Sequence, residues 1–195
     1  MADMANDKEM INELTYGEKD LHTLTAKLVF SYIPKEMTAK EVKKKFHEER
    51  SKAKGYEFAF NYAGNASTIQ RNFGLTAEKA NNIYNSYMSG FNGLKAYIDL
   101  RKKDWWEKGY INLNPKVGFK ANIYDYPYLK KVQESFSKPG FWEYYREMKA
   151  IDRHCSTVEK VTEFFKRRSA SDRQSVNYPI QHTGALCYMV SMINF

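Results

Sequence analysis

A row of side chains between residues 50 and 62 constrains the fold of this chain more than any other feature of its sequence. The row recurs at steps of four residues and consists of Arg50, Lys54, Phe58 and Tyr62. On an α-helix a step of four residues overshoots a full turn by about 40°, so these side chains form one slanting stripe. The stripe is cationic at one end and aromatic at the other. It predicts a helix that would suit a ligand with a phosphate tail and an aromatic head, such as a nucleotide.

Helical periodicity continues on both sides of this row. Thr38 and Glu41 have the spacing of a capping box, which predicts one charged helix from there towards Tyr62, with Gly64 at its end. A long amphipathic helix is predicted after Thr76, and its far end, RKKDWWEKG, leads to a turn.

The pattern changes in the second half of the chain. Residues 110–124 alternate around the sequence NPKVG at residues 114–118, which predicts a β-hairpin. Ser156 with Glu159 marks another helix start, and the segment KRRSASDR predicts a basic connection into the last helix. The sequence has no internal repeat, low-complexity linker or clear domain boundary. We therefore expect a mainly α (α+β) fold in which residues 1–195 form a single segment.

The charge balance favours an anionic partner. The chain has 31 Lys and Arg residues against 23 Asp and Glu residues, a net charge of +8. Such an excess of cations favours nucleic acid as a partner. Aromatic and basic residues interleave in FWEYYREMK and RKKDWWEKGY, a composition that suits base stacking and phosphate contact. Amphipathic helices with their rings in the core would give the same pattern, so both readings stay open.

The cysteines point to an intracellular protein. Cys155 and Cys187 are too few and too far apart for a zinc cage or a disulfide framework, and His154 beside Cys155 is no metal site without further ligands. The longest apolar run is too short to span a bilayer. We therefore expect a cytoplasmic protein that has no membrane partner and no metal ligands of this type.

A second row at four-residue steps lies near the end of the chain and consists of Arg173, Asn177 and Gln181. These side chains carry hydrogen-bond donors that suit the acceptors in a DNA minor groove. A polar row on a solvated helix face has the same spacing, so the residues alone do not decide between the two roles.

Three motifs in this order resemble family A DNA polymerases over nearly the whole chain. From the N-terminal side, DLHTLTAKLVF resembles the D-[IL]-H-x3-A segment; RSKAKGYEFAFNY resembles motif B, the R-x3-K-x3-F-x3-Y fingers helix; and RQSVNYPIQHTGA resembles the R-x3-N-x-P-x-Q-G-T-x-A segment. The sequence around the hairpin resembles the bacteriophage members of the family more than the bacterial repair enzymes. The resemblance implies a helical fingers subdomain with one β-hairpin and part of a palm. It also implies DNA-directed DNA polymerase activity in DNA replication, within the host cytoplasm if the gene belongs to a phage.

The resemblance assigns roles position by position. The residues that match contacts to the incoming dNTP are His22, Arg50, Lys54, Phe58 and Tyr62. Lys54 also matches a candidate proton donor to the leaving pyrophosphate, the one catalytic role implied. Phe58 implies a preference for nucleotides with a 3′ hydroxyl over dideoxy analogues. The residues that match minor-groove contacts to the primer–template DNA are Arg173, Asn177 and Gln181. Without its DLH context, His22 would be taken for an ordinary helix residue.

Two positions depart from the family pattern. Ala63 stands where the family usually has Gly after the motif B tyrosine, although Gly64 follows and can serve the turn. His182 replaces the Gly that follows the family's Gln, and an imidazole there could crowd the helix against the palm or the duplex.

The largest departure concerns the metal-binding aspartates. Two-metal catalysis needs carboxylates that hold two cations about 4 Å apart. In this family they come from a D-Y-S-x2-E-L-R strand and an H-D-E turn, and neither motif occurs in the sequence. The aspartates without such a context are Asp20, Asp104, Asp125 and Asp152. We therefore expect Mg²⁺ to serve the complete enzyme but to have no ligand in this chain.

The missing motifs lead to the expectation of a fragment that is inactive alone and works with the polymerase segments that carry them. Two alternatives remain. The chain could be a non-catalytic nucleic-acid-binding module that keeps the basic surface, or a polymerase gene remnant that does not fold stably by itself.

Overall fold

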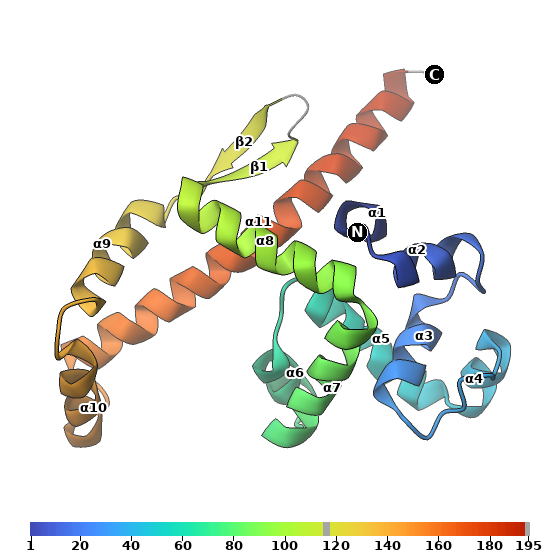
Figure 1. The fold of residues 1–195 in the computed structure, drawn as a ribbon, viewed down its shortest axis with the longest axis horizontal. Coiled ribbons are helices and arrows are strands. Elements are labelled where there is room, and N and C mark those ends of the chain that lie inside the picture. Colours follow the sequence, from blue (N-terminus) through green and yellow to red (C-terminus); the bar gives the residue numbers. More distant parts are fainter. Residues whose placement is uncertain (115–117, 194–195) are drawn as a thin grey trace. The chain divides into compact units, whose positions relative to one another are not determined.

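The computed structural model describes residues 1–114 and 118–193 (Figure 1). Within these residues the backbone forms helices and one two-stranded antiparallel sheet, so the predicted mainly helical fold with one β-hairpin is confirmed. The contacts divide the chain into two compact units, Met1–Leu100 and Arg101–Phe195. In the described ranges no helix is long and apolar enough to cross a membrane.

The first unit is helical. Its elements are α1 (Ala2–Ala5), α2 (Lys8–Thr15), α3 (Leu21–Val29), α4 (Ala39–Lys45), α5 (His47–Asn61), α6 (Ala66–Phe73), α7 (Ala77–Gly90) and the start of α8 (Asn92–Lys108). Helix α3 packs against both α5 and α7. Ala26, Val42 and Ala53 form a small buried cluster where α3, α4 and α5 meet. This packing fixes α5, the helix that carries the first row, against α3.

Helices α4 and α5 are two elements where the sequence predicted one. The capping box is present, because the Glu41 N–H donates to Thr38 Oγ1 and the Thr38 N–H donates to Glu41 Oε2. The backbone leaves the helical region at Phe46, with φ −128° and ψ 44°. The Phe46 ring packs against the cluster of Ala26 and Val42. Burial of this ring outweighs the helical preference of the lysine-rich run, and the single-helix prediction was wrong.

The helix predicted after Thr76 is also interrupted, at Phe91 between α7 and α8. Phe91 is fully buried, and Asp7 from the start of the chain caps the helix that follows. Asp7 Oδ2 accepts a bond from the Leu94 N–H at 2.9 Å, while its Oδ1 accepts one from the Met10 N–H at 3.0 Å. One buried carboxylate therefore caps both α2 and α8. Gly93 leaves the necessary room, since a Cβ there would lie 2.6 Å from the Cα of Asp7.

The second unit is built around the hairpin and one long helix. Its elements are the rest of α8, β1 (Tyr110–Asn114), β2 (Phe119–Asn122), α9 (Tyr126–Phe136), α10 (Phe141–Ile151) and α11 (Ser156–Ile193). The strands are antiparallel, with Tyr110 opposite Asn122 and Asn112 opposite Lys120. The hairpin prediction is confirmed, although its turn residues 115–117 lie outside the described residues. The core of the unit contains Trp105, Ile111, Leu129, Phe136 and Phe164.

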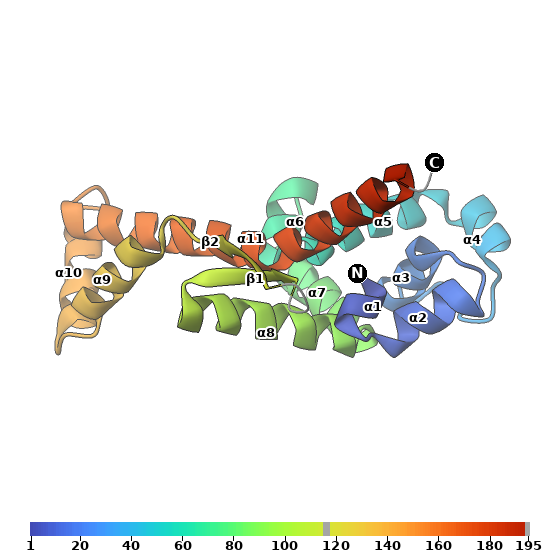
Figure 2. The same cartoon turned by 90° about the horizontal axis from the view of Figure 1, so that it is seen from above.

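Helix α11 runs without a break through the segment KRRSASDR (Figure 2). The basic connection predicted there was wrong. The segment contains no Gly or Pro, and its arginines pair along the helix, Arg167 with Glu163 at 2.7 Å and Arg168 with Asp172 at 3.4 Å. Pairs at this spacing support a helix rather than a loop.

Pro179 lies inside α11, where its missing N–H leaves the carbonyl of Ser175 without its helical partner. Arg101 of α8 replaces that partner. Its Nε donates to the Ser175 carbonyl at 3.4 Å, and its second guanidinium nitrogen donates to the Asn112 carbonyl of β1 at 2.7 Å. One guanidinium thus joins three elements of the second unit and satisfies the backbone at the proline.

Candidate functional site

Three members of the predicted stripe form an open cationic and aromatic surface on α5. Lys54 is exposed and makes no ion pair within the described part of the chain. The side chains of Phe58 and Tyr62 are 51% and 44% exposed, and their rings stack with centroids 6.4 Å apart and planes at 21°. We call Lys54, Phe58 and Tyr62 the open surface of α5. Exposed stacked rings beside a free cation can take up a base and its phosphates together.

Arg50, the first member of the stripe, is held by the carboxylate of Asp20, the residue that caps α3. Its guanidinium donates to both oxygens of Asp20, at 2.9 and 3.1 Å, and to Thr23 Oγ1 at 3.3 Å. Asp20 also caps α3 through the Thr23 N–H. Partial burial alone would raise the pKa of Asp20, but the bonds from Arg50 and Thr23 outweigh it and keep that pKa below its ordinary value. Arg50 is therefore oriented by the fold, with its remaining terminal nitrogen unbonded among the described residues.

His22 is held in the same way by a carboxylate of α5. Its Nδ1 lies 2.7 Å from Oε2 of Glu57, which also accepts a longer bond from Thr25 Oγ1. Because the carboxylate is an acceptor, Nδ1 carries the proton and the Nε2 edge of the ring is left for another contact. Glu57 is only 7% exposed. The two pairs, Arg50 with Asp20 and His22 with Glu57, bind α3 to α5 beside the open surface.

Sequence reasoning missed these two carboxylates as partners. In the sequence, Asp20 stands out only as an aspartate without the context of a metal ligand. Glu57 directly precedes Phe58 and looks like an ordinary solvated glutamate in a charged helix. The available signal was helical geometry, because residue 57 falls on the side of α5 that also carries the buried Ala53 and Phe60.

The turn after α5 carries the first departure from the family pattern. Ala63 adopts a left-handed backbone with φ 57°, a conformation that costs a residue with a Cβ free energy. Gly64 follows, and its N–H donates to the Ala59 carbonyl at 2.8 Å. A Cβ at position 64 would lie 2.5 Å from that carbonyl oxygen. Gly64 therefore serves the turn because its backbone can lie close to the Ala59 carbonyl. The left-handed backbone conformation is adopted by Ala63 instead.

The second row lies on α11 in the other unit. Arg173 and Gln181 are exposed, and Arg173 donates to Ser169 Oγ at 2.8 Å. Asn177 Oδ1 is buried without a hydrogen-bond partner among the residues described. His182, the second departure, turns its ring edge-on against Phe119 of β2 with centroids 5.4 Å apart. The imidazole therefore packs against the hairpin of its own unit.

The described residues do not fit a two-metal centre. Among them, no group of three or more His, Cys, Asp or Glu side chains could hold a metal ion. The aspartates noted in the sequence have other contacts: Asp20 with Arg50, Asp104 with Lys108, Asp125 with Arg167, and Asp152 with the His154 N–H.

Comparison with known proteins gives relatives of one kind. DNA polymerase I of Bacillus subtilis (strain 168) is 28% identical over 111 residues, which cover 57% of this chain and 12% of the relative. DNA polymerase I of Lactococcus lactis subsp. lactis (strain IL1403) is 24% identical over 195 residues, all of this chain and 17% of the relative. The chain therefore spans less than a fifth of the length of either relative.

A solved structure has a similar fold. The POL domain of Pol1 from M. smegmatis, in complex with DNA primer-template and dNTP, matches with a TM-score of 0.64 and 21% identity over 99% of this chain and 26% of that one. The family described as DNA polymerase family A matches residues 1–195 in full. The chain therefore belongs to DNA polymerase family A.

Proposed function

We propose that this chain supplies contacts to the incoming nucleotide and to the primer–template in a DNA-directed DNA polymerase. The observation that carries the proposal is the open surface of α5, in a chain whose full length matches family A. In this proposal residues 1–195 are one segment of the polymerase domain, the fingers with part of the palm.

Each side chain of the α5 site has a role in the proposal. Lys54, Arg50 and His22 bind the triphosphate, because cations offset the negative charge that builds on phosphate oxygens during transfer. Lys54 also donates a proton to the leaving pyrophosphate. The carboxylates that hold Arg50 and His22 orient these groups before the nucleotide arrives, which lowers the entropy cost of binding.

The aromatic end of the site receives the sugar and base. Phe58 packs on the nucleotide and favours substrates with a 3′ hydroxyl, and Tyr62 stacks near the templating base. The exposure of both rings supports these roles.

On α11, Arg173, Asn177 and Gln181 contact minor-groove acceptors of the primer–template duplex. The unbonded Oδ1 of Asn177 supports this role, because a buried polar group without a partner is costly unless a ligand or water satisfies it.

The catalytic carboxylates belong to other polymerase segments in this proposal, and these 195 residues alone do not polymerise DNA. Met189 and Met192 support such partners, since they are 50% and 60% exposed near the end of α11. A bacteriophage origin is part of the hypothesis and rests on the hairpin sequence alone, because the relatives named above are bacterial.

Primer extension tests the function. The purified chain is assayed on a primed template with dNTPs and Mg²⁺, first alone and then with the polypeptides encoded beside it that carry both aspartate motifs. We expect extension only in the mixture. Lys54→Ala should lower the extension rate about a hundredfold or more, because general acid catalysis contributes at least that much. Lys44→Ala, at an exposed position of α4, is the matched control and should leave the rate unchanged.

Other outcomes separate the alternatives. A non-catalytic binding module would be identified by two results together. No mixture would extend the primer, and DNA affinity would fall steeply with salt but would not change on Lys54→Ala. A thermal melt without a cooperative transition would identify a gene remnant. Extension by the chain alone would contradict the absence of catalytic carboxylates.

A further inference from the structure

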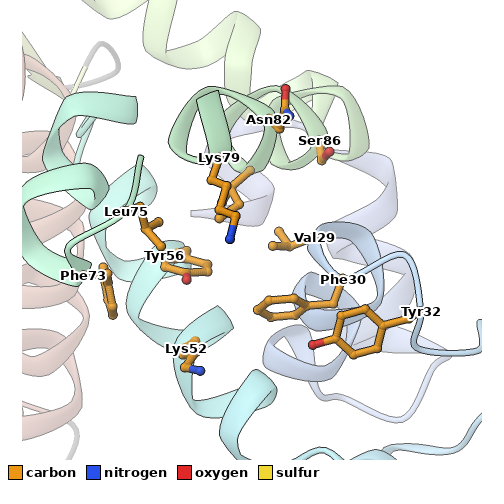
Figure 3. A pocket seen from close by; sticks show the side chains of 11 residues that line it. Val29, Phe30, Tyr32, Lys52, Tyr56, Phe73, Leu75, Lys79, Asn82 and Ser86 are labelled. Atoms are coloured by element: carbon orange, nitrogen blue, oxygen red, sulfur yellow. The ribbon is translucent and has the colours of Figure 1, made fainter. Parts of the chain in front are cut away.

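The first unit contains a pocket of about 520 Å³ beside α5 (Figure 3). Lys52 lines it, and two residues along a helix rotate the side chain by about 200°, so Lys52 and Lys54 lie on opposite faces. The other walls come from the end of α3, from α6 and from α7. The pocket is therefore separate from the nucleotide site proposed above.

Three aromatic rings form one wall of the pocket. Tyr56 lies between Phe30, at 6.4 Å between centroids, and Phe73, which meets it edge-on at 4.8 Å. Gly55 makes room for this arrangement, since a Cβ there would lie 2.5 Å from the Phe73 ring. Tyr56 is only 2% exposed, and its hydroxyl is not among the buried polar atoms that lack a partner, so the hydroxyl remains open to the pocket. A ligand in the pocket can therefore bond to this hydroxyl in place of water.

Two cations complete the pocket. Lys52 reaches it from α5 and Lys79 from α7, and neither has an ion-pair partner in the ranges that the structure describes. Figure 3 shows the amino group of Lys79 directed into the space between Tyr56 and Phe30. Lys79 is the third residue of α7, where the positive end of the helix dipole disfavours a cation. Lys79 thus adds positive potential to the pocket, although a cation at this position lowers the stability of α7.

We infer that this pocket binds one nucleotide unit, with the base against the rings and the phosphate between Lys52 and Lys79. A purely apolar ligand would leave two lysines unused, and an inorganic anion would leave the rings unused. Asn82 and Ser86 on α7 add an amide and a hydroxyl that can bond to the edge of a base. A free nucleotide and a nucleotide within single-stranded DNA share this chemistry. The inference does not depend on polymerase activity.

Titration calorimetry in the presence of EDTA tests the site without catalysis. The probes are dAMP, deoxyadenosine, inorganic phosphate and a short dT oligomer. We expect dAMP or the oligomer to bind more tightly than deoxyadenosine or phosphate alone. Lys79→Glu should weaken that binding by about tenfold or more, because it replaces a charge-assisted contact with repulsion. Lys40→Glu makes the same change in the first turn of α4, also at an exposed position, and should have no such effect.

Thermal unfolding of the same variants distinguishes a lost contact from a lost fold. Both substitutions place an anion at the positive end of a helix, so each should raise the unfolding midpoint or leave it unchanged. Weaker binding in a Lys79→Glu protein that is at least as stable as the wild type would support the site.

The probes and a third variant decide the remaining outcomes. Binding of dAMP alone assigns the pocket to free nucleotides, and binding of the oligomer alone assigns it to single-stranded DNA; either supports the inference. If Lys40→Glu weakens binding as much as Lys79→Glu does, the probe is attracted by net charge only, and the inference is overturned. Loss on Lys54→Ala without loss on Lys79→Glu would place the ligand on the open surface of α5 and also overturn it, as would the absence of saturable binding.

Discussion

Helices α5 and α11 each carry a row of side chains at four-residue spacing, but the polar members of the two rows differ in their contacts. On the α5 side, Arg50 and its neighbour His22 are bonded to the carboxylates of Asp20 and Glu57. On α11, Asn177 has a buried oxygen without a partner in the described ranges, and Gln181 is exposed. Arg50, the first member of the α5 row, thus contributes to the stability of the protein, whereas Asn177 and Gln181 of the α11 row keep unused hydrogen-bonding capacity. Spacing alone shows which residues share a face, not whether they are already bonded.

The backbones of the two helices differ as well. The irregularity in α11 is Pro179, and Arg101 satisfies the carbonyl that the proline leaves free. The irregularity after α5 is the left-handed Ala63, and no side chain can relieve the crowding of its own Cβ. The first irregularity is compensated by a neighbour, and the second is strain that a substitution can remove.

The largest effect is expected from replacing Asp20, the carboxylate that holds Arg50 of the α5 row. Asp20→Ala should lower the free energy of unfolding by about 2 to 4 kcal/mol, because it removes both the N-cap of α3 and the paired bonds from Arg50. Asp20→Asn keeps a capping oxygen but loses the charge, so it should lower the free energy of unfolding by less than Asp20→Ala does. Urea unfolding at neutral pH measures both variants. If neither lowers the free energy of unfolding, the pair of Arg50 and Asp20 does not stabilise the fold.

The same carboxylate gives a pH dependence of known sign. The pKa of Asp20 is lowered by folding, so its contribution is complete above the unfolded pKa and is lost as the pH falls through the folded value. The stability difference between wild type and Asp20→Asn should therefore shrink as the pH is lowered from about 5 towards about 2. A difference that grows over this range would contradict the assignment.

The next effect concerns the proline in α11. Arg101→Met should lower the free energy of unfolding by about 1 to 3 kcal/mol, because it leaves two backbone carbonyls without their donor. Pro179→Ala restores an N–H to the Ser175 carbonyl, so Arg101→Met should cost less in that background. A double-mutant cycle from urea unfolding should show a coupling of about 1 kcal/mol. Strict additivity of the two substitutions would mean that the guanidinium does not compensate for the proline.

A smaller effect, of opposite sign, is expected in the turn after α5. Ala63→Gly should raise the free energy of unfolding by about 1 kcal/mol, because glycine adopts the left-handed conformation without the Cβ penalty. The matched control is Ala59→Gly within α5, which should lower it by about the same amount. Thermal unfolding of both variants gives the comparison, and a loss of stability at position 63 would argue against the left-handed turn.

The smallest effect is expected in the α11 row. Asn177→Leu should change the free energy of unfolding by no more than about 0.5 kcal/mol, because the buried amide oxygen has no bond to lose within the described fold. The same variant should weaken binding to a primed template if the α11 row reads the duplex. A stability loss as large as that of Asp20→Ala would erase the contrast between the two rows.

Local patterns predicted the parts of this fold that depend on neighbours in sequence. The capping box at Thr38, the hairpin, the start of α11 at Ser156 and the stripe on α5 were all readable in this way. Each depends on side chains within a few residues of one another, so their spacing carries the information.

The features that sequence reasoning did not find depend on distant partners. The break before α8 needs Asp7, which lies 87 residues before Leu94 in the sequence. Arg50 and His22 find their carboxylates at separations of 30 and 35 residues. Helical or strand periodicity cannot predict partners that are so far apart in sequence. These contacts form only when α3, α5 and α8 pack.

The bond from Asp7 to Leu94 has a consequence for how the first unit can be rearranged. It brings a residue near the start of that unit, Met1–Leu100, within hydrogen-bonding distance of a residue near its end. Adjacent termini are the usual condition for circular permutation. A permuted first unit could therefore join its old ends through a short linker and begin at an exposed position such as Gly74, between α6 and α7. Its helices would keep their partners although the order of the chain had changed.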